Sequence, residues 1–311
     1  MKHEHLEGLL AVAMFATVAG ATLDAGAWDG SQNLEPGLDP GAILLFEDFE
    51  SADFGSSWPT YWGAPPGPDT VSDPVWAGSR ALIINSFAGE HYSDGGGEYA
   101  PFTGAGEGVD EIYMRLYIFL EDGYSLGTCN QLKLFAIKGG ASIDQTYGGA
   151  GVVPTGYDKM AVVLAIDNDW ALHFYTYHMD QASVWGDYQY LSTAGQAYLE
   201  AGRWVELEVG VKLNTPGQAD GVIRGWVDGV LRGEVRGLRF RLVNDVKIRR
   251  LDIEQYWGGG GPENTSPVNQ SAFIDNVVVS NLPVGSSSGD GGGGDTGGTD
   301  AGTGGDTGGT D

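Results

Sequence analysis

Short segments in which apolar and polar residues alternate are the feature of this sequence that most constrains its fold. Such a period of two places successive side chains on opposite faces of a β-strand. Helical spacing of apolar residues at i, i+3, i+4 and i+7 is not found beyond the first 25 residues. The candidate strands cover residues 42–49, 80–86, 98–102, 111–120, 130–138, 159–166, 170–178, 188–191, 204–213, 222–227, 230–236, 246–253 and 272–280. We therefore expect an all-β protein.

Turn-forming residues separate these segments. The stretches "DNDW" at 167–170, "NTPG" at 214–217 and "DG" at 228–229 have the chemistry of tight turns. Asp167, Asn168 and Asp169 in the first of these stretches join two strands, which favours a hairpin turn over a calcium site. Many short strands with no helix between them predict a β-sandwich or jelly roll.

The two ends of the chain differ from its body. Residues 1–27 contain a 13-residue apolar run followed by small-x-small sites, and we interpret them as a signal peptide. Residues 285–311 are dominated by Gly, Ser, Thr and Asp and repeat "GGDTGGTD" twice, so we expect a flexible linker. The jelly-roll domain then spans 28–284. These ends predict a secreted or cell-surface protein of a bacterium with no membrane span.

Charge and cysteine content exclude several classes of function. Three acids and one lysine precede residue 28 and five aspartates follow residue 284, which leaves 34 acids and 15 bases in the body. A nucleic-acid partner needs a basic face, so none is expected. The single cysteine, Cys129, allows no intrachain disulfide and no cysteine-based metal site, and a small buried residue is the more ordinary interpretation of it than a nucleophile.

Three strands carry an unusual second face. One face of each holds aliphatic side chains typical of a sandwich core. The other faces hold Tyr113, Arg115 and Tyr117, then Gln131, Lys133 and Phe135, then His173, Tyr175 and Tyr177. If these strands share one curved sheet, they line an aromatic groove with two cations, which suits sugar rings. The alternative is a second core layer beneath a covering loop.

Four longer stretches resemble a known group of proteins. They are "NQLKLFAIKGG" at 130–140, "KMAVVLAIDNDWALHFYTYHMD" at 159–180, "RWVELEVGVKLNTPGQADGVIRGWVDG" at 203–229 and "FIDNVVVS" at 273–280. They resemble the concanavalin A-like jelly-roll families, in particular the family 14 and family 20 polysaccharide lyases. The resemblance implies a jelly-roll sandwich of two antiparallel sheets, and β-elimination on a uronate polysaccharide.

The resemblance also implies roles for particular residues. Lys133 would neutralise the uronate carboxylate, Tyr175 or Tyr177 would transfer protons, and His173 is an alternative base. The related lyases have an arginine on the first strand of the 159–180 hairpin, where this chain has none, and Arg115 is a candidate to replace it. The expected substrate-binding residues are Tyr113, Tyr117, Gln131 and Phe135.

Other chemistries have less support. The paired-carboxylate E-x-D-x-E motif of jelly-roll glycosidases is absent. The histidines lack metal-binding spacing and the glycine-rich loops lack a following helix, so we expect no catalytic metal and no phosphate loop. No cofactor is expected to be required, although structural calcium in the loops stays open. The expected form is a monomer. The alternative function is a non-catalytic carbohydrate-binding or adhesion module on a flexible stalk.

Overall fold

The structure is a computed structural model that describes residues 34–35, 37–51, 60–62, 69–147 and 151–285. The signal peptide expected at 1–27 lies outside the described residues, as does the linker beyond its first residue.

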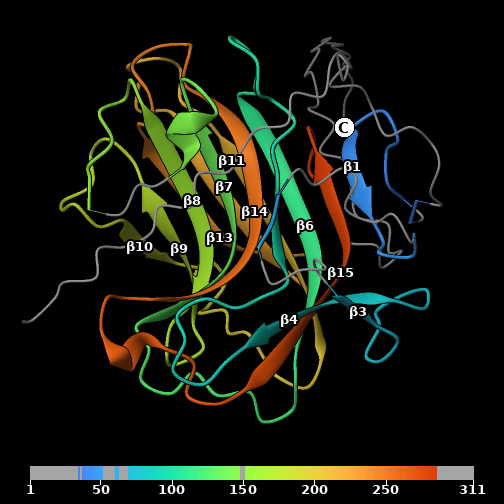
Figure 1. Ribbon diagram of the computed structural model, residues 1–311. Helices are drawn as coiled ribbons and strands as arrows, with labels where there is room; N and C mark the ends of the chain where they lie inside the picture. The colour runs from blue at the N-terminus through green and yellow to red at the C-terminus, as the bar shows by residue number, and fades with distance from the viewer. Residues whose placement is uncertain (1–33, 36, 52–59, 63–68, 148–150, 286–311) are drawn as a thin grey trace, which may run out of the picture.

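Two antiparallel sheets form a sandwich, which confirms the predicted all-β jelly roll (Figure 1). Sheet A has eight strands, which in spatial order are β13 (Val230–Leu238), β12 (Gly221–Val227), β11 (Trp204–Lys212), β6 (Glu111–Leu120), β15 (Gln270–Ser280), β4 (Ala81–Ser86) and β3 (Asp69–Val71), with β1 (Ile43–Glu47) paired to β15.

Sheet B has seven strands and carries Lys133, Tyr175 and Tyr177. In spatial order they are β10 (Asp187–Tyr190), β9 (Leu172–Tyr177), β8 (Lys159–Ile166), β7 (Gln131–Gly140), β14 (Lys247–Gly258), β5 (Gly96–Tyr99) and β2 (Thr60–Trp62). The described helical structure is limited to two 3-10 turns, η1 (Asp144–Thr146) and η2 (Pro262–Asn264).

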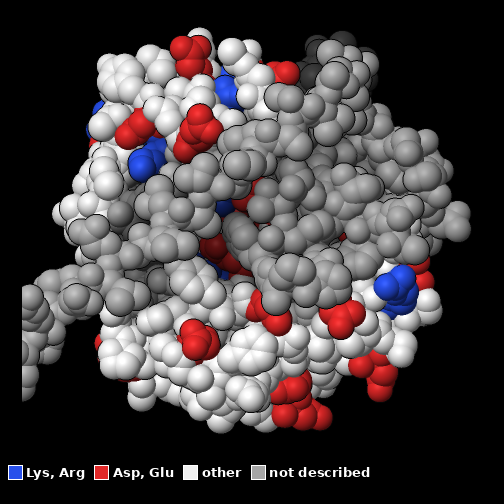
Figure 2. Space-filling view, viewed as in Figure 1, with Lys and Arg blue, Asp and Glu red and all other residues white. Residues whose placement is uncertain are grey.

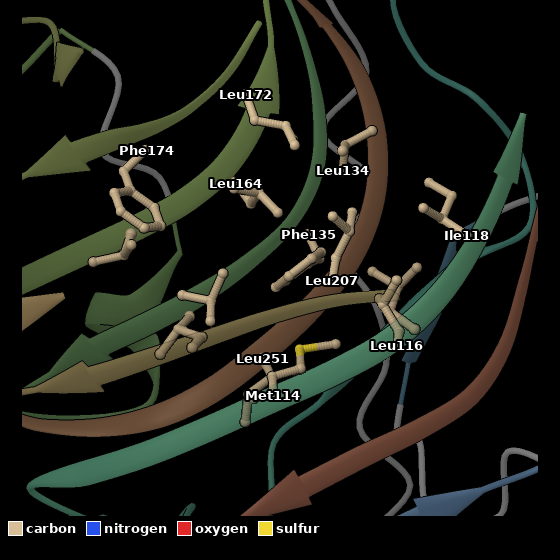
Figure 3. Close-up of a cluster of buried hydrophobic side chains, with 14 of the residues drawn as sticks. Met114, Leu116, Ile118, Leu134, Phe135, Leu164, Leu172, Phe174, Leu207 and Leu251 are labelled. Carbon is tan, nitrogen blue, oxygen red and sulfur yellow. The ribbon is translucent and has the colours of Figure 1, made fainter. Parts of the chain in front are cut away.

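The main hydrophobic core fills the space between the two sheets. Figure 3 shows Met114, Leu116 and Ile118 of β6 among leucines and phenylalanines that come mostly from sheet B. All of these side chains are buried, and each contributes roughly 1.5–3 kcal/mol by leaving water. Because most of the described strands bury one face in this way, the opposite face of each sheet is left to carry polar chemistry.

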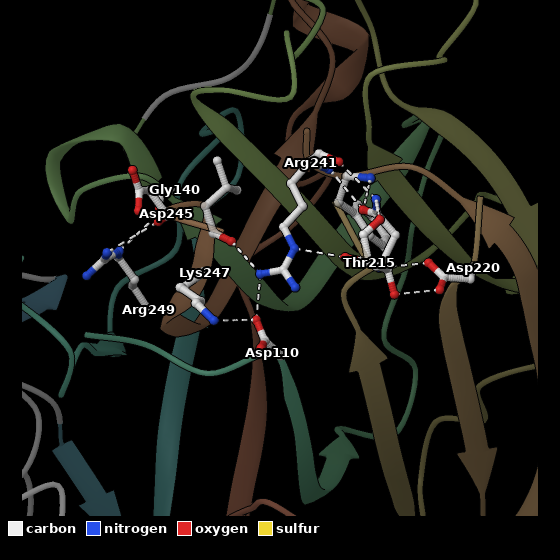
Figure 4. Close-up of polar contacts among 11 residues, drawn as sticks. Asp110, Gly140, Thr215, Asp220, Arg241, Asp245, Lys247 and Arg249 are labelled. Carbon is white, nitrogen blue, oxygen red and sulfur yellow. Dashed lines mark hydrogen bonds and ion pairs between the residues drawn. The ribbon is translucent and has the colours of Figure 1, made fainter. Parts of the chain in front are cut away.

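Ion pairs close one end of the sandwich (Figure 4). Asp110 accepts contacts from Arg241 at 2.5 Å and from Lys247 at 2.7 Å. Burial raises the pKa of Asp110, but these two cations outweigh it and hold that pKa below its usual range. Arg241 also donates through Nε to the carbonyl oxygen of Asn214 at 2.8 Å, which fixes the loop that follows β11.

The outer face of sheet A holds buried charges under a cover of chain segments. Arg115 is fully buried and pairs with Glu35 at 2.7 Å. Tyr117 donates to Glu206 at 2.8 Å, and the ring of Trp76 stacks on Tyr117 with 4.2 Å between centroids. Polar groups on this face are therefore part of a second packed layer.

Both ends of the described domain are held on this same face. The carboxylate of Glu208 accepts the backbone N–H groups of Val284 at 2.9 Å and Gly285 at 3.2 Å. Glu35, near the other end, is bound by Arg115 and by the amide of Asn276. The chain thus enters and leaves the sandwich over sheet A.

Asp275 predicts a pH dependence of stability. Burial raises its pKa to about 7, although three backbone N–H groups oppose the rise. Between about pH 4 and 7 the folded protein holds a proton that the unfolded chain has released, so the free energy of unfolding falls as pH rises. We expect the wild type to lose roughly 2 kcal/mol relative to Asp275→Asn from about pH 5 to 7, measured by urea unfolding. Parallel curves for the two proteins would contradict this.

Candidate active site

The three strands that we expected to form one groove lie in different sheets. Strand β6 belongs to sheet A, whereas β7 and β9 belong to sheet B. The prediction that Tyr113, Arg115 and Tyr117 share a groove with Lys133 is therefore wrong. Alternation fixes which face of a strand is polar, but it carries no information about which sheet the strand joins.

Phe135 is also not where alternation placed it. It is buried in the core, and its expected role in substrate binding is wrong (Figure 3). A β-bulge is the cause: Lys133 pairs with Ala165 and Phe135 pairs with Leu164, so that Leu134 is an extra residue in β7. The bulge turns Phe135 inward. Beyond it Ala136 is on the outer face, in a cluster with tyrosines of β9.

Small side chains along β8 form the floor of a trough on the outer face of sheet B. This strand contributes Ala161, Val163 and Ala165 to that face, opposite Tyr177, Tyr175 and His173 of β9 in turn. On its other side, β7 brings Lys133 opposite Ala165 and Lys138 opposite Ala161. We call this row of β8 residues and the longer side chains that flank it the trough. Figure 2 shows a hollow, with charged side chains at its bottom, in the part of the view where Figure 1 draws β7, β8 and β14.

Lys133 lies between two tyrosine rings in the trough. Its Nζ is 5.6 Å from the ring centroid of Tyr175 and 4.6 Å from that of Tyr256. Asp252 and Glu254 of the neighbouring strand pair with Lys138 instead, and no residue that the structure describes forms an ion pair with Lys133. Burial lowers the pKa of Lys133, while the negative charge of Glu254 partly restores it. An ammonium group held by aromatic faces and lacking a close carboxylate is prepared to bind an anion.

Tyr175 and Tyr177 share a hydrogen bond beside this lysine. Their hydroxyl oxygens lie 3.3 Å apart. Burial, followed by the hydrogen bond to Tyr175, raises the pKa of Tyr177 well above its usual value. The raised pKa keeps the proton on Tyr177, and either hydroxyl can be the donor in this hydrogen bond. Of the two phenols, Tyr175 is the one whose ring lies beside the Lys133 ammonium.

His173 is fully buried and does not face the trough opening. Its ring stacks under Tyr188 with 4.6 Å between centroids, and Nε2 donates to Oε1 of Gln131 at 3.2 Å. Burial lowers its pKa to about 4, so the ring is neutral near pH 7. These contacts assign His173 to the positioning of Gln131 and Tyr188, and they leave Tyr175 as the better candidate base.

Three aromatic residues on the outer face of sheet B, Tyr188, Tyr190 and Tyr256, were not predicted from the sequence as part of the site. Tyr188 and Tyr190 of β10 are 43% and 46% exposed, which is high for side chains of this size. Tyr256 of β14 contacts Lys133 and packs against Tyr92 in a tilted arrangement, with 4.8 Å between ring centroids. The tyrosines of β10 could have been found, because their strand was expected, but Tyr256 follows the end of the strand predicted at 246–253.

Charged residues next to the trough form a network of ion pairs with one another. Lys138 pairs with Asp252, and Arg250 also pairs with Asp252 at 2.5 Å and with Glu98 at 3.5 Å. The hydroxyl of Tyr147 donates to Glu98 at 2.5 Å while its ring covers Arg250. This network could not be predicted from the sequence, because its charged members come from β5, β7 and β14, which are far apart along the chain.

No metal-binding cluster is found among the described residues. They contain no cluster of three or more histidine, cysteine, aspartate or glutamate side chains placed to hold a metal ion. His178 instead lies 2.9 Å from the carboxylate of Asp187.

Among the described residues, no helix is long and apolar enough to cross a membrane.

The sequence model of the Polysaccharide lyase 14 family matches residues 87–277, which include every strand of the trough. The chain belongs to this family. No curated protein matches it.

Solved structures show the same fold at low sequence identity. Alginate lyase vAL-1 from Chlorella virus has a TM-score of 0.60 at 16% identity, covering 77% of this chain and 100% of that one. The PL-14 alginate lyase from Aplysia kurodai has a TM-score of 0.55 at 18% identity, covering 68% and 86%. The endo-β-1,4-glucuronan lyase from Trichoderma reesei has a TM-score of 0.52 at 16% identity, covering 77% and 96%.

Proposed function

We propose that this protein is a secreted lyase that cleaves an acidic polysaccharide at a uronate residue, with Lys133 and Tyr175 as its catalytic pair. The observation that carries the proposal is the unpaired ammonium of Lys133 beside the ring of Tyr175, on the sheet face of a polysaccharide lyase family member. Alginate and glucuronan lyases with the same fold support an acidic polymer as the substrate.

The chemistry requires three events at one sugar ring. Lys133 binds the carboxylate on C5 and stabilises the negative charge that develops when the C5 proton leaves. The Tyr175 oxygen, in its phenolate form, accepts that proton, and the electron pair of the C5–H bond forms the C4–C5 double bond as the C4–O4 bond breaks. Tyr175 then returns the proton to O4. The hydrogen bond between Tyr177 and Tyr175 holds the Tyr175 oxygen in place throughout.

A non-catalytic carbohydrate-binding module is the second candidate function. It is favoured by the exposed rings of Tyr188 and Tyr190, which would stack on sugars in a binding protein as well as in an enzyme. Such a module needs the rings but has no need of Tyr175 as a proton acceptor.

A matched pair of tyrosine variants separates the two candidates. We expect the wild type to release unsaturated ends from a uronate polymer, measured as ultraviolet absorbance. Tyr175→Phe should lower kcat by about 10²–10⁴-fold because it removes the proton-transferring oxygen. Tyr177→Phe, which removes only a supporting hydrogen bond worth about 1 kcal/mol, should lower it by roughly tenfold or less. Retained polymer binding with no absorbance in the wild type would reject the lyase and favour the module.

A further inference from the structure

Among the residues that the structure describes, the trough offers only one cation that is free to bind a substrate carboxylate near the reacting sugar, Lys133. We propose that the substrate is a heteropolysaccharide in which the cleaved uronate lies between neutral sugars, rather than a polymer made of uronates alone. This inference rests on the proposed function, because it concerns the sugars on either side of the one that Lys133 binds.

The count of cations is complete for the domain. The chain has 16 lysines and arginines, and all of them except Lys2 are described. On the outer face of sheet B, Lys138 and Arg250 are occupied by carboxylates. Lys159 also lies on this face, but it is six residues along β8 from Ala165, the partner of Lys133. It is therefore about 20 Å from Lys133, several sugar rings away.

The neighbouring charges are net negative. The network of Lys138 and Arg250 contains three carboxylates, those of Glu98, Asp252 and Glu254. Glu254 also acts on Lys133, whose positive charge it stabilises. The domain around it is acidic throughout, with a chain net charge of -26. A second carboxylate on the next sugar would meet this negative field with no cation to offset it, since such repulsion acts over about 8 Å in physiological salt.

The side chains at both edges of the trough are aromatic and carry no positive charge. Tyr188 and Tyr190 are exposed on the β10 side. On the β14 side, Tyr92 is exposed and packs against Tyr256, which contacts Lys133. The faces of these rings suit the C–H faces of sugars and supply no positive charge to offset a carboxylate. The trough thus combines one anionic subsite with flanking apolar ones, which is the pattern of an isolated uronate.

Binding is tested first on Tyr175→Phe, so that turnover does not interfere. The probes are polymannuronate, with a carboxylate on every ring, and deacylated gellan, in which one 4-linked glucuronate lies among neutral sugars. We expect gellan to bind at least about tenfold more tightly at low salt. Raising the ionic strength should narrow the gap, because screening weakens repulsion of the polyanion. Equal binding of the two polymers, or tighter binding of polymannuronate at low salt, overturns the inference.

Charge variants locate the origin of the preference. Glu254→Gln should raise the affinity for polymannuronate several-fold relative to that for gellan, because it removes one carboxylate beside Lys133 while its effect on the charge of Lys133 is shared by both polymers. Glu200→Gln is the matched control, since its carboxylate is exposed in the loop before β11 of sheet A. An equal effect of both variants on polymannuronate would refute a local origin. Absence of product from the wild type on both polymers would instead count against the proposed lyase, and the binding preference would still be decided.

Discussion

Replacing Lys133 by alanine is expected to lower kcat/KM on a uronate polymer by about 10²–10³-fold. The variant loses the ammonium that neutralises the carboxylate charge in the transition state, and no other free cation lies nearby on this face of the described structure. Burial disfavours the charged form of Lys133 even in the wild type, so the folded protein should tolerate the change. Initial rates of unsaturated-end formation, together with circular dichroism, measure both effects.

Lys159→Ala is the matched control for this experiment. It removes the same charge from the same face of sheet B, from the first residue of β8 and far from Tyr175. We expect its kcat/KM to stay within about threefold of the wild type, because its charge is largely screened at this distance. Equal losses in both variants would mean that Lys133 acts only through the general field of the protein.

Replacing Arg115 by alanine is expected to cost about 3–5 kcal/mol of stability near pH 7. The change leaves Glu35 without its ion pair and leaves the buried carboxylates of Glu206 and Glu208 without a nearby cation. Burial already raises the pKa of both, so they take up protons as pH falls and the deficit should shrink by about pH 5. Urea unfolding at the two pH values measures this.

Two comparisons complete the Arg115 experiment. Arg224→Ala breaks a partly exposed ion pair with Glu234 on the same sheet and should cost only about 0–1 kcal/mol. The folded fraction of Arg115→Ala should retain wild-type lyase activity, since Arg115 lies on the opposite side of the sandwich from Lys133. A loss of activity per folded molecule would restore Arg115 as a catalytic candidate.

The architecture was largely predictable because it depends on local patterns. Alternation in 111–120 and 204–213 identified strands that the structure has at Glu111–Leu120 and Trp204–Lys212. The short strand β2 at Thr60–Trp62 was missed, because three residues are too few to show a period. Turn chemistry placed the ends of most strands within a few residues, since hairpin geometry limits which residues can form a turn.

The site was predictable in part. Lys133, Tyr175 and Tyr177 do lie near one another, because β7, β8 and β9 are consecutive and pair in order. Arg115 could not be assigned correctly, since a long-range crossover decides that β6 pairs with β11 and β15. Phe135 was misplaced by a bulge that has no signal in the local alternation. Sequence patterns thus predict well which face of a strand a side chain occupies. The pairing partners of a strand and its β-bulges depend on contacts between segments that are far apart in the sequence.

The attachment of Val284 and Gly285 to Glu208 has a consequence for how the protein meets its target. These residues lie at the back of the sandwich, whereas Lys133 lies at its front. A tether or companion module joined after Gly285 would leave the front unobstructed. An enzyme attached in this orientation can act on an insoluble polysaccharide gel or cell wall, because its substrate-binding face points away from the attachment point.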